Sequence, residues 1–86
     1  MSYRKIIDYF GEDNQVDKAI EELRELENEL CLKDINIYGL YQEIADVLNM
    51  LIQLVIIFNL KWWKIIKIMI GKNKRTLKRV EVGYYE

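Results

Sequence analysis

The segment from Leu40 to Phe58 constrains the fold most, because apolar residues cover most of the circumference of a predicted helix there. Its main stripe recurs at helical spacing and consists of Leu40, Ile44, Val47, Leu48, Leu51, Leu54, Val55 and Phe58. Three further apolar residues widen the arc beyond what one neighbouring helix can cover: Met50, Ile52 and Ile57. A chain of 86 residues buries only about 60–65% of its unfolded surface. We therefore expect this helix to be buried in an oligomer.

Three other segments carry apolar residues at helical spacing, and the chain contains no proline to interrupt them. The predicted helices are Ser2–Phe10, Asn14–Leu32, Leu40–Phe58 and Lys61–Glu81. We expect Gly11 to end the first helix. Asp13 or Asn14 is expected to cap the second helix, and Asn59 the fourth. The predicted fold is all-α, with one domain over residues 1–86 that assembles as a homodimer or homotetramer.

The residue types that are missing exclude several kinds of chemistry. The sequence contains no histidine and a single cysteine, Cys31. A Ser/His or Cys/His catalytic pair is therefore excluded, as are a zinc site of the Cys/His type and an intramolecular disulfide. No signal peptide is visible, because charges occur throughout Met1–Phe10. We expect a cytoplasmic protein.

Two groups of carboxylates are set into the apolar pattern of the second and third helices. Glu22 and Glu25 are three residues apart, as are Glu43 and Asp46, and residues at this spacing are neighbours on one helix face. Two such helices packed side by side would bring four carboxylates together. Unpaired charge is costly near a core, so this grouping points to a hard cation such as Mg²⁺. Taken singly, each pair is also the ordinary pattern of a solvated helix face.

Charge is unevenly distributed along the chain, despite a net charge of −1. Residues 12–46 hold eleven of the fourteen acids, whereas residues 61–79 hold eight of the thirteen basic residues and no acid. The two halves could bind cations and phosphates respectively, or they could neutralise each other within the fold or between subunits. Nucleic-acid binding is disfavoured, because the basic stretch is local and the acidic half would repel phosphate.

The acidic residues resemble the signature of a known family. The pattern E-E-x-x-E…E-x-x-D of the MazG-like, all-α nucleoside triphosphate pyrophosphohydrolases is matched by Glu21-Glu22-x-x-Glu25 and, after a gap of 17 residues, by Glu43-x-x-Asp46. This signature is moderately specific.

The resemblance extends to both sides of the acidic signature. Tyr9-Phe10-Gly11 with Asn14-Gln15 looks like the N-terminal part of small, phage-type members. The segment Lys72-x-x-Arg75-Thr76-Leu77-x-Arg79 resembles the basic end of their last helix. The resemblance therefore covers most of the chain, but Leu60–Ile70 departs from the family in its high content of Trp and Ile.

The resemblance implies a four-helix, metal-dependent hydrolase that cleaves a nucleoside or deoxynucleoside triphosphate to the monophosphate and pyrophosphate. The metal ligands would be Glu22, Glu25, Glu43 and Asp46, with Mg²⁺ as the ion and Mn²⁺ as a substitute. The ions would bridge phosphate oxygens and lower the pKa of a bound water. Glu21 or Glu25 would accept the proton of that water as the catalytic base.

Residues outside the acidic groups are candidate substrate contacts. Lys72, Arg75 and Arg79 would hold phosphates, or they form a solvated helix end that suits the helix dipole. Gln15 and Asn49 carry amide groups that would read a base or orient the ligand. A further candidate is Trp62, which would stack on a base, although packing in a core or an interface is the more common use of tryptophan.

Two other functions remain open. The helix Lys61–Arg79 would also suit a basic amphipathic helix on an anionic membrane surface. Alternatively, the chain is a catalytically silent helical module that oligomerises or binds a partner protein. A membrane-spanning segment is not expected. The apolar run Val47–Leu60 is shorter than the ~20 residues required and is interrupted by Asn49, Gln53 and Asn59.

Overall fold

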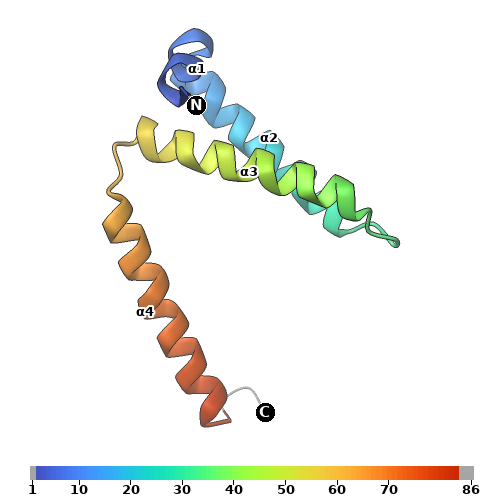
Figure 1. Cartoon of the computed structure of the whole chain (residues 1–86), viewed down its shortest axis with the longest axis vertical. Helices are drawn as coiled ribbons and strands as arrows, with labels where there is room; N and C mark the ends of the chain where they lie inside the picture. The colour runs from blue at the N-terminus through green and yellow to red at the C-terminus, as the bar shows by residue number, and fades with distance from the viewer. Residues whose placement is uncertain (1, 84–86) are drawn as a thin grey trace.

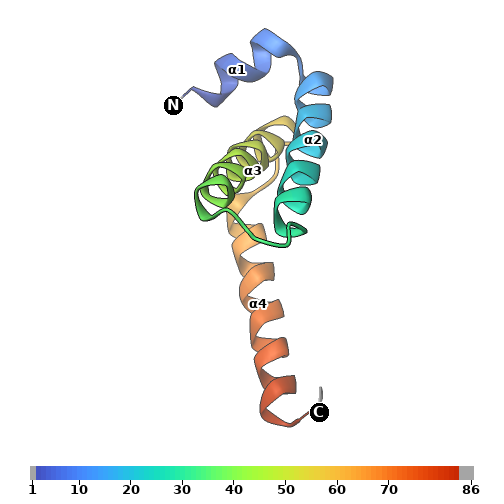
Figure 2. The same cartoon turned by 90° about the vertical axis from the view of Figure 1, so that its right-hand side faces the viewer.

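The structure, a computed structural model, describes residues 2–83. Within this range the chain forms four helices and no strand: α1 (Tyr3–Phe10), α2 (Glu12–Leu30), α3 (Ile37–Ile57) and α4 (Trp62–Glu81). The predicted all-α class is therefore confirmed. α2 and α3 lie side by side and run in opposite directions, α1 crosses one end of this pair, and α4 extends away from it (Figures 1 and 2).

Gly11 separates the first two helices, as predicted. It has a φ of 94°, a conformation that glycine adopts without steric cost. The prediction that Asp13 or Asn14 caps α2 is wrong, because Gly11 is the N-cap residue and α2 begins at Glu12. The side chain of Asn14 is instead used at the end of α1, where Nδ2 donates a 2.7 Å hydrogen bond to the Phe10 carbonyl.

The ends of α3 also differ from the prediction. The helix begins at Ile37 rather than Leu40, because the side chain of Asn36 accepts a hydrogen bond of 3.0 Å from the Gly39 backbone N–H. Asn59 does not cap α4. It adopts a positive φ of 51° after the end of α3, which asparagine tolerates better than most residues, and Lys61 is the N-cap residue of α4.

The core is small and lies where α1, α2 and α3 meet. Its buried apolar residues are Ile7, Ala19, Val47, Met50 and Val55. Two buried amides join them: Nε2 of Gln15 donates a hydrogen bond of 2.7 Å to Oε1 of Gln53, across the contact between α2 and α3. This bond avoids the cost of burying the two polar groups without a partner.

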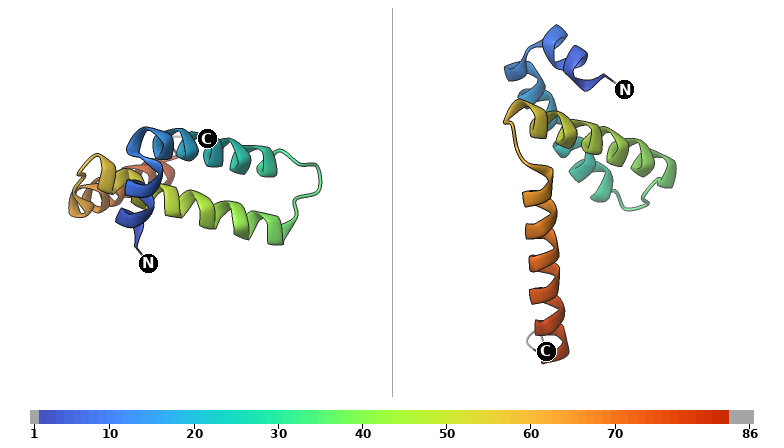
Figure 3. Two further views of the ribbon diagram at one scale, coloured as in Figure 1. Left: turned by 90° about the horizontal axis from the view of Figure 1, so that it is seen from above. Right: turned by 60° about the vertical axis from the view of Figure 1, so that its left-hand side comes forward.

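α4 lies outside this packed group. The other three helices pack against one another, whereas α4 projects from the end of α3, and none of its residues is buried (Figures 1 and 3). Its exposed side chains include both tryptophans, Trp62 and Trp63. The single chain thus consists of three packed helices and one projecting helix.

Among residues 2–83, one helix, α3, has the length and composition of a membrane-spanning segment, with 21 residues and an 18-residue stretch whose mean hydropathy is 1.5. The apolar run Val47–Leu60 forms the second half of this helix and the turn after it. Core helices of soluble proteins have the same properties, so length and hydropathy alone do not place α3 in a membrane.

Candidate metal centre

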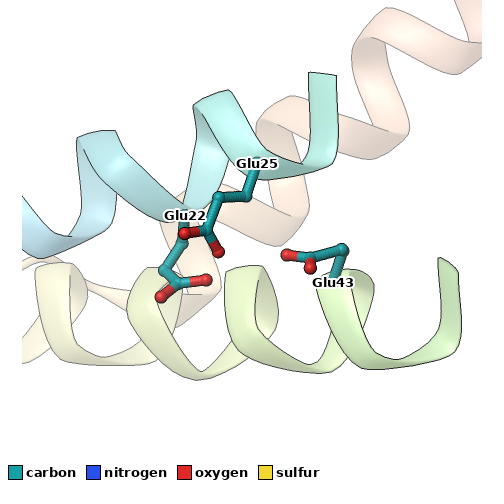
Figure 4. A group of neighbouring side chains, drawn as sticks. All are labelled: Glu22, Glu25 and Glu43. Atoms are coloured by element: carbon teal, nitrogen blue, oxygen red, sulfur yellow. The ribbon is translucent and has the colours of Figure 1, made fainter. Parts of the chain in front are cut away.

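Three carboxylates from α2 and α3 meet in the contact between these helices (Figure 4). Glu22 and Glu25 come from α2 and Glu43 comes from α3, and one oxygen of each lies within 4.8 Å of the other two. The three-residue spacing of Glu22 and Glu25 turns both side chains toward α3. The structure thus brings together three of the four predicted metal ligands.

Glu22 is the buried member of this carboxylate group and is only 6% exposed. Its Oε2 has no hydrogen-bond partner among residues 2–83, and neither has Oε2 of the half-buried Glu43. Buried carboxylate oxygens without partners are costly, and a shared cation removes that cost. Because all the ligand atoms are carboxylate oxygens, the group suits a hard cation such as Mg²⁺, with Mn²⁺ as an alternative.

The charges within the carboxylate group act on one another. When Glu25 carries a proton it can donate a side-chain hydrogen bond to Glu22, and this is the largest cause that raises the pKa of Glu25. Repulsion by the Glu22 charge raises it further, with smaller contributions from desolvation, Glu43 and Glu21. A proton on Glu25 therefore relieves part of the repulsion. A cation would relieve the same repulsion, so protons and cations compete for this side chain.

Lys18 is a neighbour of the carboxylate group that the sequence analysis missed. Its Nζ lies 3.1 Å from Oε1 of Glu22 and 3.6 Å from Oε1 of Glu21. The hydrogen bond to Glu22 raises the pKa of Lys18, and the charges of Glu21 and Glu22 raise it further. The signal was present in the sequence, since a lysine four residues before Glu22 lies on the same face of a helix.

The two remaining acidic candidates lie beside the group rather than in it. Asp46, the predicted fourth ligand, is exposed on α3 and does not belong to the three-carboxylate group. Glu21, the candidate base or additional ligand, is exposed and pairs with Lys18.

Glu29 was not among the candidate ligands, although it lies one turn beyond Glu25 on α2. Its Oε1 is buried without a hydrogen-bond partner among residues 2–83. The carboxylate approaches α3 at Gly39, where a Cβ atom would lie 2.8 Å from Oε1 of Glu29. The absence of a side chain at Gly39 therefore allows this close approach.

The candidate base-reading amides are already engaged within the protein. Gln15 is buried against Gln53, and it also lines a pocket of about 510 Å³ together with Phe10 and Lys18. Asn49 is exposed, and its Oδ1 accepts a hydrogen bond of 2.8 Å from the Tyr3 hydroxyl.

The candidate phosphate ligands and Trp62 lie on the projecting helix. Lys72, Arg75 and Arg79 are exposed on the part of α4 that runs away from α2 and α3 (Figure 1). Trp62 is 50% exposed and lines an apolar groove of about 490 Å³ between α3 and the start of α4. Within one chain, the structure does not bring these residues to the carboxylate group.

Comparison of the chain with models of known protein families, with curated proteins and with solved structures finds no match. The resemblance to the MazG-like pyrophosphohydrolases therefore depends on the residues quoted above and stays a prediction.

Proposed function

We propose that this protein hydrolyses a nucleoside or deoxynucleoside triphosphate to the monophosphate and pyrophosphate in a Mg²⁺-dependent reaction. The observation that carries the proposal is the position of Glu22, a buried carboxylate whose Oε2 has no partner and whose neighbours are Glu25 and Glu43. The resemblance of the acidic signature to the MazG-like enzymes supports the same reaction. The proposed site of action is the cytoplasm.

The carboxylate group would hold the cation. Glu22, Glu25 and Glu43 are the proposed ligands on the basis of their proximity. Asp46 follows Glu43 by three residues and stays a proposed fourth ligand. When bound, the ion would neutralise charge on the phosphates and lower the pKa of a bound water. Mn²⁺ would substitute for Mg²⁺ because it accepts the same oxygen ligands.

Glu25 is the first proposed base, because a carboxylate beside the ion that is not fully engaged by it would accept the proton of the bound water. Glu21 is the second candidate, held near the group by its ion pair with Lys18. The nucleotide would lie toward the pocket lined by Gln15 and Lys18, while Asn49 and Trp62 stay proposed contacts of the base.

Release of pyrophosphate from a panel of nucleotides tests this proposal. We expect turnover with Mg²⁺ and none after removal of divalent cations. Glu22→Gln should reduce turnover by about a hundredfold or more, because the metal loses a charged ligand that would stabilise the transition state. Glu27→Gln is the matched control, since Glu27 is an exposed glutamate on the same helix. Undiminished turnover in Glu22→Gln would overturn the metal assignment, and a folded protein that cleaves no nucleotide would be a silent helical module.

A membrane-surface function is the second candidate, because no residue of α4 is buried and the helix combines basic residues with exposed Trp62, Trp63 and Ile66. An amphipathic helix of this composition lies in the interface of an anionic bilayer. Sedimentation with anionic and with neutral vesicles tests this function. Binding to anionic vesicles alone would support it, and failure to sediment with either would exclude it.

A further inference from the structure

We propose that a second copy of this chain covers the outward side of α3 and the apolar side of α4, and that α4 of each copy supplies phosphate-binding cations to the carboxylate group of the other. The first part is independent of the proposed function, whereas the second part rests on it.

The outward side of α3 carries a regular apolar stripe that stays exposed within residues 2–83. Its exposed members are separated alternately by four and three residues over most of its length: Ile37, Tyr41, Ile44, Leu48, Leu51 and Phe58. Each is at least 43% exposed. Val55 occupies the position between the last two and is buried. This spacing is the pattern by which one helix packs along another, so the stripe predicts a helical partner.

The apolar side of α4 continues this surface. Its exposed members are Trp62, Ile66, Met69, Leu77 and Val80, each at least 50% exposed. The groove between α3 and α4 joins the two stripes, because Leu48 and Leu51 line it from α3, and Trp62 and Met69 line it from α4. Contiguous apolar surface of this extent is rare on a monomeric soluble protein and marks an interaction site.

The distribution of charge favours a second copy over an anionic membrane as the occupant. Residues 37–57 contain no Lys or Arg but include two acids, Glu43 and Asp46, so an anionic surface would not attract the stripe on α3. The basic residues on α4 are complementary to the acidic residues of α2. Because α4 runs away from α2 (Figures 1 and 3), the basic residues of α4 do not meet the acidic residues of α2 within one copy. In a two-fold dimer, each copy uses the same surface, so α4 of each copy can meet the acidic residues of the other.

This arrangement would also bring further cations to the carboxylate group, in addition to Lys18 of the same chain. A triphosphate beside Glu22 and Glu43 needs cationic contacts in addition to the metal. Lys72 and Arg75 are the candidates, but they lie on the helix that leaves their own carboxylate group (Figure 1). In a dimer with the proposed interface, Lys72 and Arg75 from α4 of the second copy would add to Lys18, which already lies beside Glu22 in its own chain.

The oligomeric state, measured by sedimentation without nucleotide or metal, tests the surface. We expect a dimer or a multiple of a dimer at micromolar concentration. Leu51→Glu should produce monomers that keep their helical circular dichroism, and the milder Leu51→Ala should weaken association at least tenfold. Leu23→Glu is the matched control, because Leu23 is a similarly exposed leucine on α2. A monomeric wild-type protein would contradict the proposed interface between two copies. Association that Leu51→Ala leaves unchanged would contradict it too. Vesicle binding by a monomer would overturn it as well.

Mixing two inactive variants tests the shared site. Glu22→Gln inactivates one copy's carboxylate group, and the double substitution Lys72→Ala/Arg75→Ala removes the other copy's cations. Random exchange makes half of the dimers mixed, and each mixed dimer has one intact site. We therefore expect roughly a quarter of the wild-type turnover. Affinity tags on the two copies confirm that mixed dimers form, and Lys5→Ala, outside α4, should stay active.

If mixed dimers form but the mixture stays inactive, α4 does not act on the other copy and this assignment is overturned. If the wild-type protein itself turns over no nucleotide, the proposed function and the shared site both fail. The sedimentation measurement still decides the surface in that case, since it uses neither nucleotide nor metal.

Discussion

The ammonium group of Lys18 lies 3.1 Å from Oε1 of Glu22, the buried member of the carboxylate group, while Oε2 of the same side chain has no partner among residues 2–83. Lys18 therefore neutralises part of the charge that a divalent cation would neutralise. Solvent screens this pair, because the Lys18 side chain is about half exposed (47%).

Lys18→Met should strengthen cation binding by about threefold to tenfold, because it removes a positive charge beside the site and the remaining interaction is screened. Isothermal titration with Mn²⁺ would measure the change. Lys33→Met removes a lysine in the loop between α2 and α3 and should leave the affinity unchanged. Weaker binding in Lys18→Met would show that Lys18 organises the site instead of competing with the cation.

Removing the cation should lower the thermal stability of the wild-type protein. A ligand that binds only the folded state stabilises it by about 2.7 kcal/mol at a hundredfold excess over its Kd. We expect Mg²⁺ to raise the Tm of the wild-type protein and of Glu27→Gln, but not that of Glu22→Gln. Calorimetry with Mg²⁺ and with a chelator would measure this difference. An equal rise in all three proteins would place the cation elsewhere.

The pH dependence of stability should report the repulsion at Glu25. Its pKa is raised in the folded state, first by the hydrogen bond with Glu22 and then by the Glu22 charge. Such a group contributes stability below its ordinary pKa of 4.5 and loses that contribution as the pH rises through the raised value. Without metal, the wild-type protein should therefore lose stability relative to Glu25→Gln as the pH rises above 4.5. Urea unfolding across this range would measure the difference, and parallel curves for the two proteins would contradict it.

Gly39→Ala tests the close approach of Glu29 to α3. The added Cβ would lie 2.8 Å from Oε1 of Glu29, so the carboxylate must move. The substitution should therefore be more favourable by about 0.5–1 kcal/mol in a Glu29→Ala background than in the wild-type protein. A double-mutant cycle in urea would measure this coupling. Gly71→Ala is the control, because nothing lies within 4 Å of the added atom and no coupling to Glu29 is expected.

Gln53→Leu should destabilise the protein by about 1–3 kcal/mol, because it leaves the buried amide of Gln15 without its partner. The double substitution Gln15→Leu/Gln53→Leu should recover most of this loss, since neither polar group is then buried. Urea unfolding of the two variants would measure both effects. Equal stability of the single and double variants would show that the amide pair contributes nothing beyond its packing.

The parts of the fold that follow local sequence patterns were predictable. Apolar spacing located all four helices, and the start of α3 moved to Ile37 because the side chain of Asn36 binds the backbone there. The start of α2 also moved, from Asn14 to Glu12, although its N-cap residue Gly11 has no side chain to bind the backbone. The direction of α4 was not predictable, because it depends on the turn at Asn59 and on contacts with few neighbours. The Gln15–Gln53 pair was also hidden, since the partners are 38 residues apart and Gln53 lies in an apolar run.

The candidate site was predictable to the extent that it follows helix geometry. The spacing of Glu22 and Glu25 placed both on the face that meets α3, and Glu43 lies opposite them. Asp46 is three residues from Glu43, which is about 60° further round the helix. This rotation is enough to separate an exposed residue from one in the contact. Which of the two meets α2 depends on how the helices cross, and local spacing does not determine that angle.

The hydrogen bond between Gln15 and Gln53 also sets the register of α2 along α3. Apolar side chains alone would tolerate a slide by one helical turn, which is about 5.4 Å and exceeds the 4.8 Å within which the carboxylate oxygens gather. Such a slide would break the amide pair and move Glu22 and Glu25 past Glu43. The amide pair lies about 10 Å along α2 from Glu22 and takes no part in the carboxylate group. It nevertheless holds α2 and α3 in the alignment that places Glu22 and Glu25 opposite Glu43.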